Sequence, residues 1–213
     1  MVFFAIVLSL HYSPFSWRTK KINLLIASYL FYAAWNPPFV VLLWISTIVD
    51  WFVAKKMFLE QRSVRRRLLL TLSILVNLGI LGWFKYGNFL LENWVQLMSL
   101  VGIEWQAPGW DIVLPVGISF YTFQTMAYSL DVYLRRAEPS KSFLDFSLFV
   151  TFFPQLVAGP IVRPAHLIPQ FAVPHMATMR QLGWGLGLIV LGLFQKVVVA
   201  DGRVFVMLAE DES

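Results

Sequence analysis

The chain has 213 residues, of which 58% are hydrophobic and only 14% charged, and its mean hydropathy is +0.67. Because soluble domains average about 45–50% apolar and ~25% charged residues, this composition excludes an ordinary soluble protein and indicates a membrane protein. Cysteine is absent, which excludes disulfides, thiolate metal sites and a cysteine nucleophile. The formal charge of +5 is gathered in short clusters without a nucleic-acid-binding motif, so we expect the lipid bilayer and no nucleic acid as a partner.

The first part of the chain predicts several membrane helices. Residues 1–17 form an apolar run that is shorter than the ~20 residues of a full span. Its composition is not that of a signal peptide, because a basic start and a small-residue cleavage site are missing. Residues 22–54 are hydrophobic except at Asn36-Pro37-Pro38, which predicts two helices joined by a tight turn. Residues 68–101 form the next hydrophobic block.

This block carries polar residues with helical spacing. Asn77, Leu81, Lys85, Asn88 and Glu92 would share one stripe of a helix. One interpretation places the stripe in the interior of a helix bundle, where charged residues in membranes usually face and pair. The other, which we prefer, is a break near Lys85-Tyr86-Gly87 that brings the stripe to the membrane surface.

Basic clusters predict the topology. They lie at residues 18–21, 55–67 and 135–141, and they alternate with the segments 36–38 and 102–111, which have no basic residue. Since short loops rich in Lys and Arg stay cytoplasmic, this alternation predicts a multi-pass protein with its N-terminus outside. Residues 55–67 could also bind anionic lipid or an acidic carrier protein, but a purely topological role is the preferred interpretation.

Residues 112–134 predict a clear span with one polar face. Gly117, Tyr121, Gln124, Tyr128 and Asp131 fall on that face. A polar stripe of this kind is expected to face other helices or a pore rather than lipid.

Residues 149–163, FVTFFPQLVAGPIVR, are apolar at both ends but hold Pro154, Gln155, Gly159 and Pro160 between them. Prolines at this spacing cannot continue one regular helix. In a bilayer, broken backbone is tolerated only where protein or a water-filled cavity covers it. We therefore expect a broken segment inside the bundle, lining a passage, with a proline-kinked helix that merely packs as the alternative.

The last predicted elements are a proline-rich segment at residues 163–181 and a final span at 182–200. The first is expected to lie on the surface, in the cytoplasm if the broken segment re-enters and outside if it spans. Its His166 and His175 have no metal-ligand spacing, and neither they nor His11 belong to a recognised catalytic motif. No metal site is predicted. From the residues alone, the chain is a transporter or a membrane enzyme.

Six stretches carry a resemblance to a known family. They are NLLIASYLFYAAWNP, STIVDW, LGWFKYGNFL, LPVGISFYTFQTMAYSLDVY, FFPQLVAGPIVRPAHLIPQF and GLGLIVLGLFQKVVVAD, in this order over residues 22–205. Together they resemble the membrane-bound O-acyltransferase (MBOAT) family, in the branch of alginate O-acetyltransferase and the related D-alanyl and peptidoglycan acyltransferases. The chain looks like the amino-terminal portion of such a protein, so that residues 1–213 would be one membrane domain that is part of a longer one.

The resemblance implies an all-α, polytopic bundle of tilted and broken helices around a tunnel in the bacterial inner membrane. It also implies an acyl donor, a thioester of acetyl or a similar group, as co-substrate on the cytoplasmic side and no bound cofactor. The acceptor would be an exported polysaccharide such as alginate, with a periplasmic or cytoplasmic acyl-transfer protein as a further partner. The family's catalytic histidine follows a Trp- and Arg-rich motif that residues 1–213 do not contain, so no catalytic residue is assigned to this chain.

What this portion would contribute is the tunnel wall. We expect Tyr121, Gln124, Gln155 and Arg163 to line or brace the path to the reaction centre. Pro154, Gly159 and Pro160 would set its shape. The alternative function is a non-enzymatic membrane component that transports or docks a partner in an envelope polysaccharide system.

Overall fold

A computed structural model describes residues 2–103, 112–156, 159 and 162–201. The chain falls into two compact units, Met1–Pro174 and His175–Ser213, which are described separately below. Every regular element in the described residues is a helix, and three helices are long and apolar enough to cross a membrane. The predicted class, an all-α membrane protein, is confirmed. One continuous domain over 1–213 stays a prediction.

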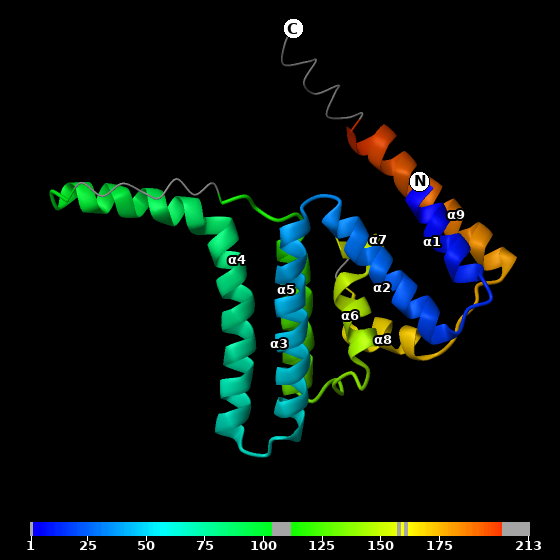
Figure 1. Cartoon of the computed structure of the whole chain (residues 1–213), viewed down its shortest axis with the longest axis horizontal. Coiled ribbons are helices and arrows are strands. Elements are labelled where there is room, and N and C mark those ends of the chain that lie inside the picture. Colours follow the sequence, from blue (N-terminus) through cyan, green and yellow to red (C-terminus); the bar gives the residue numbers. More distant parts are fainter. Residues whose placement is uncertain (1, 104–111, 157–158, 160–161, 202–213) are drawn as a thin grey trace, which may run out of the picture. The chain divides into compact units, whose positions relative to one another are not determined.

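Three helices form the centre of the first unit (Figure 1). They are α3 (Val40–Leu59), α4 (Ser63–Leu100) and α5 (Ile118–Tyr133), and each packs against the other two. The predicted turn before them is confirmed, because α2 (Trp17–Ala33) ends there and the short 3₁₀ helix η1 (Pro37–Phe39) leads into α3. Proline suits the first positions of η1, since their backbone N–H groups have no partner within the helix.

The boundaries of several elements differ from those predicted. Residues 18–21 lie in the first turns of α2 rather than in a loop, and only residues 60–62 separate α3 from α4. The helix predicted at 112–134 begins only at Ile118, because Gly117 adopts a left-handed φ of 75° that ends regular structure there. It therefore has 16 residues instead of 23.

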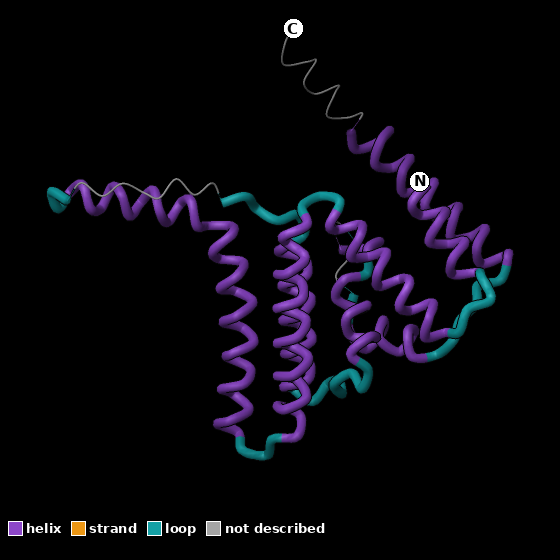
Figure 2. The backbone as a smooth tube through the Cα atoms, in the orientation of Figure 1, coloured by secondary structure: helices purple, strands orange, loops and turns teal. Residues whose placement is uncertain are grey.

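The predicted break near Lys85 is wrong, because α4 is one helix of 38 residues. It bends sharply instead of breaking, as the smooth tube in Figure 2 also shows. The proposed polar stripe is divided by this geometry: Asn77 and Leu81 are buried, whereas Lys85 and Glu92 are exposed. Only the exposure of Lys85 agrees with the preferred interpretation; the break itself, and the placement of the whole stripe at the surface, do not.

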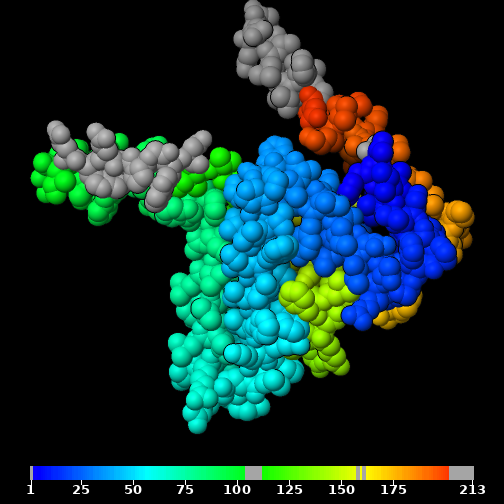
Figure 3. Space-filling model, viewed as in Figure 1, coloured from blue at the N-terminus to red at the C-terminus, as the bar shows by residue number. Residues whose placement is uncertain are grey.

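Four further helices pack beside this centre. The short α1 (Val2–Tyr12) lies along α2, and α6 (Phe143–Thr151) contacts both α2 and α3. The last two, α7 (Phe153–Leu156) and α8 (Pro164–Ala172), complete the unit. In the space-filling view, the yellow-green atoms around α6 reach the surface between α2 and α3 (Figure 3).

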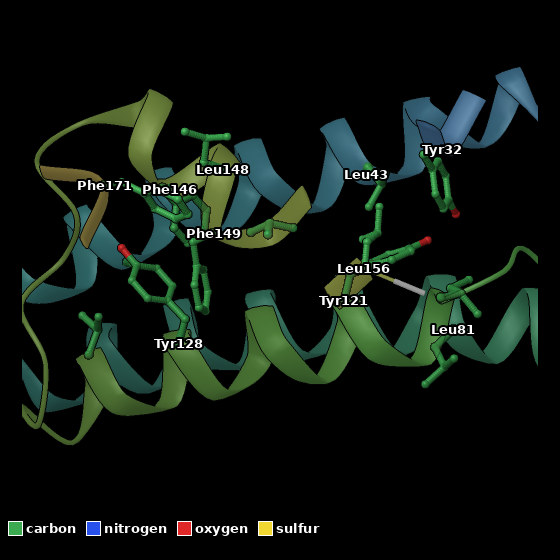
Figure 4. Close-up of a cluster of buried hydrophobic side chains, with 14 of the residues drawn as sticks. Tyr32, Leu43, Leu81, Tyr121, Tyr128, Phe146, Leu148, Phe149, Leu156 and Phe171 are labelled. Atoms are coloured by element: carbon green, nitrogen blue, oxygen red, sulfur yellow. The ribbon is translucent and has the colours of Figure 1, made fainter. Parts of the chain in front are cut away.

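The hydrophobic core of this unit draws on every helix from α2 to α8, and α5 and α6 supply most of its residues (Figure 4). The Tyr128 ring stacks on Phe146, with 4.4 Å between ring centroids, and Phe149 lies 6.3 Å from Tyr128. The buried Tyr128 hydroxyl has a hydrogen-bond partner, because it accepts from the Ser140 backbone N–H at 3.1 Å. The loop between α5 and α6 is thereby tied to the core.

The second unit holds α9 (Met179–Phe194), which continues as the π-helix η2 (Gln195–Asp201). Its start has a capping box: the Thr178 side chain accepts from the Gln181 N–H, and the Gln181 side chain accepts from the Thr178 N–H. Met179–Asp201 has the length and apolar character of a span, as predicted for residues 182–200.

Candidate functional site

The segment 149–163 is broken, as its prolines predict. α6 ends at Thr151, α7 is a single turn, and α8 begins only after Arg163. Gln155 is 7% exposed and Leu156 is buried as well, so protein covers the described residues of α7 at the break. This is the condition under which irregular backbone is tolerated at membrane depth.

Two predicted site residues meet at the break. The Gln124 Nε2 of α5 donates a hydrogen bond to the Phe149 backbone carbonyl at 2.6 Å, and the Gln155 Nε2 approaches the same oxygen at 3.4 Å. Carbonyls in the last turn of a helix have no partner within the helix, and here protein buries them. The two amides therefore supply the hydrogen bonds that the broken helix lacks, which is a bracing contact.

The residues predicted to shape the segment are placed as follows. Pro154 lies in the first turn of α7, where a missing N–H costs little. The Gly159 N–H donates to the Gln155 carbonyl at 3.0 Å. A Cβ at Gly159 would lie 2.4 Å from both Cα and Cβ of Gln155, so only glycine fits this close approach. Pro160 lies outside the described residues.

Tyr121 is 1% exposed and sits on the same helix as Gln124. Its hydroxyl interacts with the hydroxyl of the buried Tyr32, and neither oxygen has a further partner among the described residues. Figure 4 shows the two hydroxyls directed toward one another near Leu156, at the end of α7. A pair of phenol hydroxyls thus lies beside the described end of the broken segment.

Arg163 does not join this group. Its side chain is exposed at the start of α8, and His166 in the same helix is exposed as well. A role of Arg163 in lining a path stays a prediction.

Both ends of the segment 143–172 lie at one end of the bundle. At its beginning, Asp145 of α6 forms an ion pair with Lys21 near the start of α2. At its end, the Phe171 carbonyl of α8 accepts a hydrogen bond from the Trp17 Nε1 at 2.8 Å. Between them, the Phe153 N–H reaches Ser28 in the middle of α2, at 3.3 Å.

These contacts describe a re-entrant segment. Its nine-residue helix α6 is about 14 Å long at a rise of ~1.5 Å per residue, whereas the hydrocarbon core of a bilayer is ~30 Å thick. The chain enters from the side of Lys21, turns at α7 and returns beside Trp17. The sequence left two sides of the bundle open for the proline-rich segment. The structure places α8, which is part of this segment, at the same end as residues 18–21.

The other basic clusters gather at this end too. Arg66 of α4 donates to the Tyr133 carbonyl at the end of α5, and the Arg135 guanidinium lies over the Phe58 ring of α3 at 5.4 Å. The Phe143 ring at the start of α6 packs on Trp51 of α3, with 5.2 Å between centroids. All three basic clusters are thereby linked to neighbouring helix ends. We call this the basic end of the bundle.

At the opposite end, residues that follow the two segments without basic residues contact α4. Phe39 contacts Phe84, and the Asn88 Nδ2 donates to the Ile112 carbonyl at 3.4 Å. A cavity of about 340 Å³ lies between these segments. The alternation of charge in the sequence thus corresponds to two ends of one bundle.

One polar cluster was not predicted as a site. Asp50 of α3 is 0% exposed, and its Oδ1 lies 2.5 Å from the Ser73 Oγ of α4. Its Oδ2 accepts from the Asn77 Nδ2 at 2.8 Å. The Asn77 Oδ1 in turn accepts from Ser46 and Thr125, at 2.7 and 3.0 Å. From the sequence, only Asn77 was noted, as part of the polar stripe on residues 77–92. The other members escape a periodicity search because they lie on three different helices.

Comparison with known proteins gives three informative relatives. A peptidoglycan O-acetyltransferase of Helicobacter pylori is 35% identical over 85% of this chain and 38% of its own length. Two proteins named probable alginate O-acetylase AlgI, from Pseudomonas aeruginosa and Azotobacter vinelandii, are 33% and 34% identical over 94% of this chain. No family profile and no solved structure matches the chain.

The chain spans about two fifths of the length of these relatives, 38% and 40% for the two alginate O-acetylases. This coverage is consistent with the amino-terminal portion that the sequence motifs indicate. The chain belongs to the membrane-bound O-acyltransferase family, in the branch that contains the peptidoglycan and alginate O-acetyltransferases.

Proposed function

We propose that this chain is the amino-terminal part of a membrane O-acyltransferase that transfers acetyl or a similar acyl group to a hydroxyl of an exported cell-envelope polysaccharide. The relatives named above act on peptidoglycan or alginate by their names. The catalytic histidine expected for the family would lie beyond Ser213, so residues 1–213 would supply the wall of the passage and not the reacting group.

The observation that carries this proposal is the re-entrant segment and its braces. Broken backbone within a bundle is costly unless its polar groups are satisfied. Here Gln124 and Gln155 satisfy the Phe149 carbonyl, and the Tyr121 hydroxyl lies beside that of Tyr32 near the end of α7. Among the predicted wall residues, Tyr121 is the one that brings a hydroxyl to this point. It is therefore our candidate for meeting a substrate hydroxyl or carbonyl.

The topology follows from the two ends of the bundle. With the basic end in the cytoplasm, α1 begins outside, and the protein is a multi-pass protein of the bacterial inner membrane with its N-terminus outside. The acyl donor, a thioester, would reach the passage from the basic end, where the re-entrant segment opens. The polysaccharide, and a periplasmic acyl-transfer partner where one takes part, would approach from the opposite end.

The test uses the intact gene in a strain from which it has been deleted. The O-acetyl content of the exported polymer is measured with the parent gene and with Tyr121→Phe, and protein levels are compared in the membrane fraction. We expect restored acetylation with the parent and a reduced level with Tyr121→Phe at equal protein. If the secreted polymer has the same O-acetyl content in the deletion strain as in both complemented strains, the proposal is contradicted. A transport or docking component would then be favoured.

A further inference from the structure

The STIVDW stretch, residues 46–51, has no role in the proposed function, yet its Asp50 is the most deeply buried carboxyl group among the described residues. Three of its neighbours lie on helices other than its own: Ser73 and Asn77 on α4, and Ser129 on α5. Asp50 thus sits where the three central helices meet. Both carboxyl oxygens have hydrogen-bond partners within 3 Å.

Asp50 is not a member of any ion pair that the described residues form. These pairs are Lys21–Asp145, Glu60–Arg65 and Lys196–Asp201. The two basic residues nearest along the chain are directed elsewhere, since the Lys55 Nζ lies 3.7 Å from the Trp51 ring centroid and Lys56 is exposed. The titratable group facing Asp50 from α5 is the neutral phenol of Tyr128. An ionised carboxylate without a cation, removed from water, carries a penalty of several kcal/mol.

The hydrogen bonds are compatible with an uncharged acid. The Ser73 Oγ lies 2.5 Å from Asp50 Oδ1 and 3.0 Å from the Ser129 Oγ, but a hydroxyl has only one hydrogen to donate. With a proton on Asp50, the acid donates to Ser73 and Ser73 donates to Ser129, so both contacts are hydrogen bonds. The reverse order of donors also fits the oxygen positions. The charge balance decides between the two orders, because only the first leaves the site neutral.

We infer that Asp50 carries a proton in the folded protein and acts as a neutral hydrogen-bonded clamp that fixes α5 against α3 and α4. For the site, the consequence is that the clamp fixes the position of the α5 residues that brace the re-entrant segment. Thr125 and Ser129 are held on one face of α5, while Gln124 of the same helix holds the Phe149 carbonyl of the re-entrant segment. The register of α5 in the clamp therefore sets where the brace meets α6, and Asp50 is a positioning residue.

Two substitutions separate a neutral clamp from a charged one. Asp50→Asn keeps the size and a donor group but can never carry charge. Asp50→Leu removes the hydrogen bonds of Asp50, so that the Asn77 amide keeps only its bond to the Ser73 carbonyl. In the intact protein, purified in lipid nanodiscs, we expect Asp50→Asn to keep the melting temperature of the parent and Asp50→Leu to lose stability. Where Asp50→Leu yields no protein, Ser73→Ala takes its place and is expected to lower the melting temperature.

A spectroscopic measurement tests the proton itself. The infrared difference spectrum of parent minus Asp50→Asn at neutral pH should contain the carbonyl band of a protonated carboxylic acid. The control is Asp131→Asn, at the half-exposed end of α5, whose difference spectrum should lack this band.

The positional consequence rests on the proposed function, whereas the melting temperature and the infrared band do not depend on acetyl transfer. Acetylation should survive Asp50→Asn and be lost in Asp50→Leu. A carboxylate band for Asp50, or a loss of stability in Asp50→Asn equal to that in Asp50→Leu, would overturn the inference. Absence of acetylation in the parent itself would instead contradict the proposed function alone.

Discussion

At the scale of single residues, the polar groups buried in this membrane protein serve mainly to satisfy backbone and one another. The Gln124 amide donates to a backbone carbonyl, and the Tyr128 hydroxyl accepts from a loop N–H. The Ser28 hydroxyl donates to the Leu24 carbonyl and accepts from the Phe153 N–H. Each of these bonds fixes an irregular stretch against a regular helix. A buried polar group without a partner costs more free energy than its hydrogen bond contributes. Removing one partner is therefore expected to lower the stability of the folded protein markedly.

Gln124→Leu is expected to destabilise the intact protein by about 1–3 kcal/mol, because it removes the shorter of the two hydrogen bonds to the buried Phe149 carbonyl, and to reduce acetylation. Gln170→Leu is the matched control, because Gln170 is exposed on α8 and donates only within its own helix. Thermal unfolding in nanodiscs and the O-acetyl content of the polymer measure the two effects. Equal stability and acetylation for Gln124→Leu and its control would contradict the bracing role.

Gly159→Ala is expected to cost about 1–3 kcal/mol, as overpacking of a tight contact does, since the added Cβ would lie 2.4 Å from Gln155. Gly183→Ala in α9 is the control, because no atom lies within 4 Å of its added Cβ. The comparison of the two melting temperatures decides the point. A Gly159→Ala protein as stable as the control would show that the segment is not closely packed there.

The sequence was sufficient to find these residues but not all of their neighbours. Gln124 and Tyr121 follow from the polar face of a helix, and the break around Pro154 follows from proline chemistry. Asp50 could not be recognised, because one acid in an apolar helix gives no periodic signal and its partners lie on α4 and α5. Arg163 was grouped with the glutamines by position alone, whereas the start of α8 turns its side chain outward.

At the scale of elements, the re-entrant segment depends on where α6 and α8 are attached to α2. Lys21 and Asp145 hold the beginning, with side chains 13% and 8% exposed, and Trp17 holds the end. The single turn α7 packs through aromatic contacts: the Phe153 ring lies 5.3 Å from Phe3 of α1. The element is thus fixed at three points along α1 and α2.

Lys21→Met is expected to destabilise the intact protein by up to about 3–5 kcal/mol, because it leaves a mostly buried Asp145 without its cation. Exchanging the two charges, Lys21→Asp with Asp145→Lys, should restore part of the loss. Lys196→Met breaks the exposed Lys196–Asp201 pair, 72% and 55% exposed, and should stay within ~1 kcal/mol of the parent. Thermal unfolding of the four proteins measures this, and equal losses for Lys21→Met and Lys196→Met would contradict the anchoring role.

Sequence patterns predicted which elements exist better than where they begin and end. The turn at 36–38 and the broken segment follow directly from proline, whose ring excludes a continuous helix. The start of α5 depends on the left-handed conformation of Gly117, which the residue type allows but does not require. The continuity of α4 through Gly87 was missed because glycine weakens a helix without ending it.

At the scale of the whole first unit, the distribution of charge and the path of the backbone agree. The three basic clusters gather at one end, and the re-entrant segment opens toward the same end. The sequence predicted the alternation of charge, but it left the side of residues 163–181 open. The contacts of Trp17 and Lys21 with α8 and α6 place α8 at the end of the bundle that holds residues 18–21.

The most direct test is accessibility of single cysteines, for which residues 1–213 offer a background without cysteine. In an otherwise cysteine-free intact protein, Gln61→Cys, Lys141→Cys and Gln170→Cys are labelled in intact cells with a membrane-impermeant maleimide, with Trp35→Cys as the opposite-end control. All four positions are exposed. The re-entrant segment predicts that Trp35→Cys is labelled from outside, whereas the other three react only after the membrane is opened. Labelling of Gln170→Cys from outside, together with Trp35→Cys, would show that the segment spans the membrane and would contradict the account.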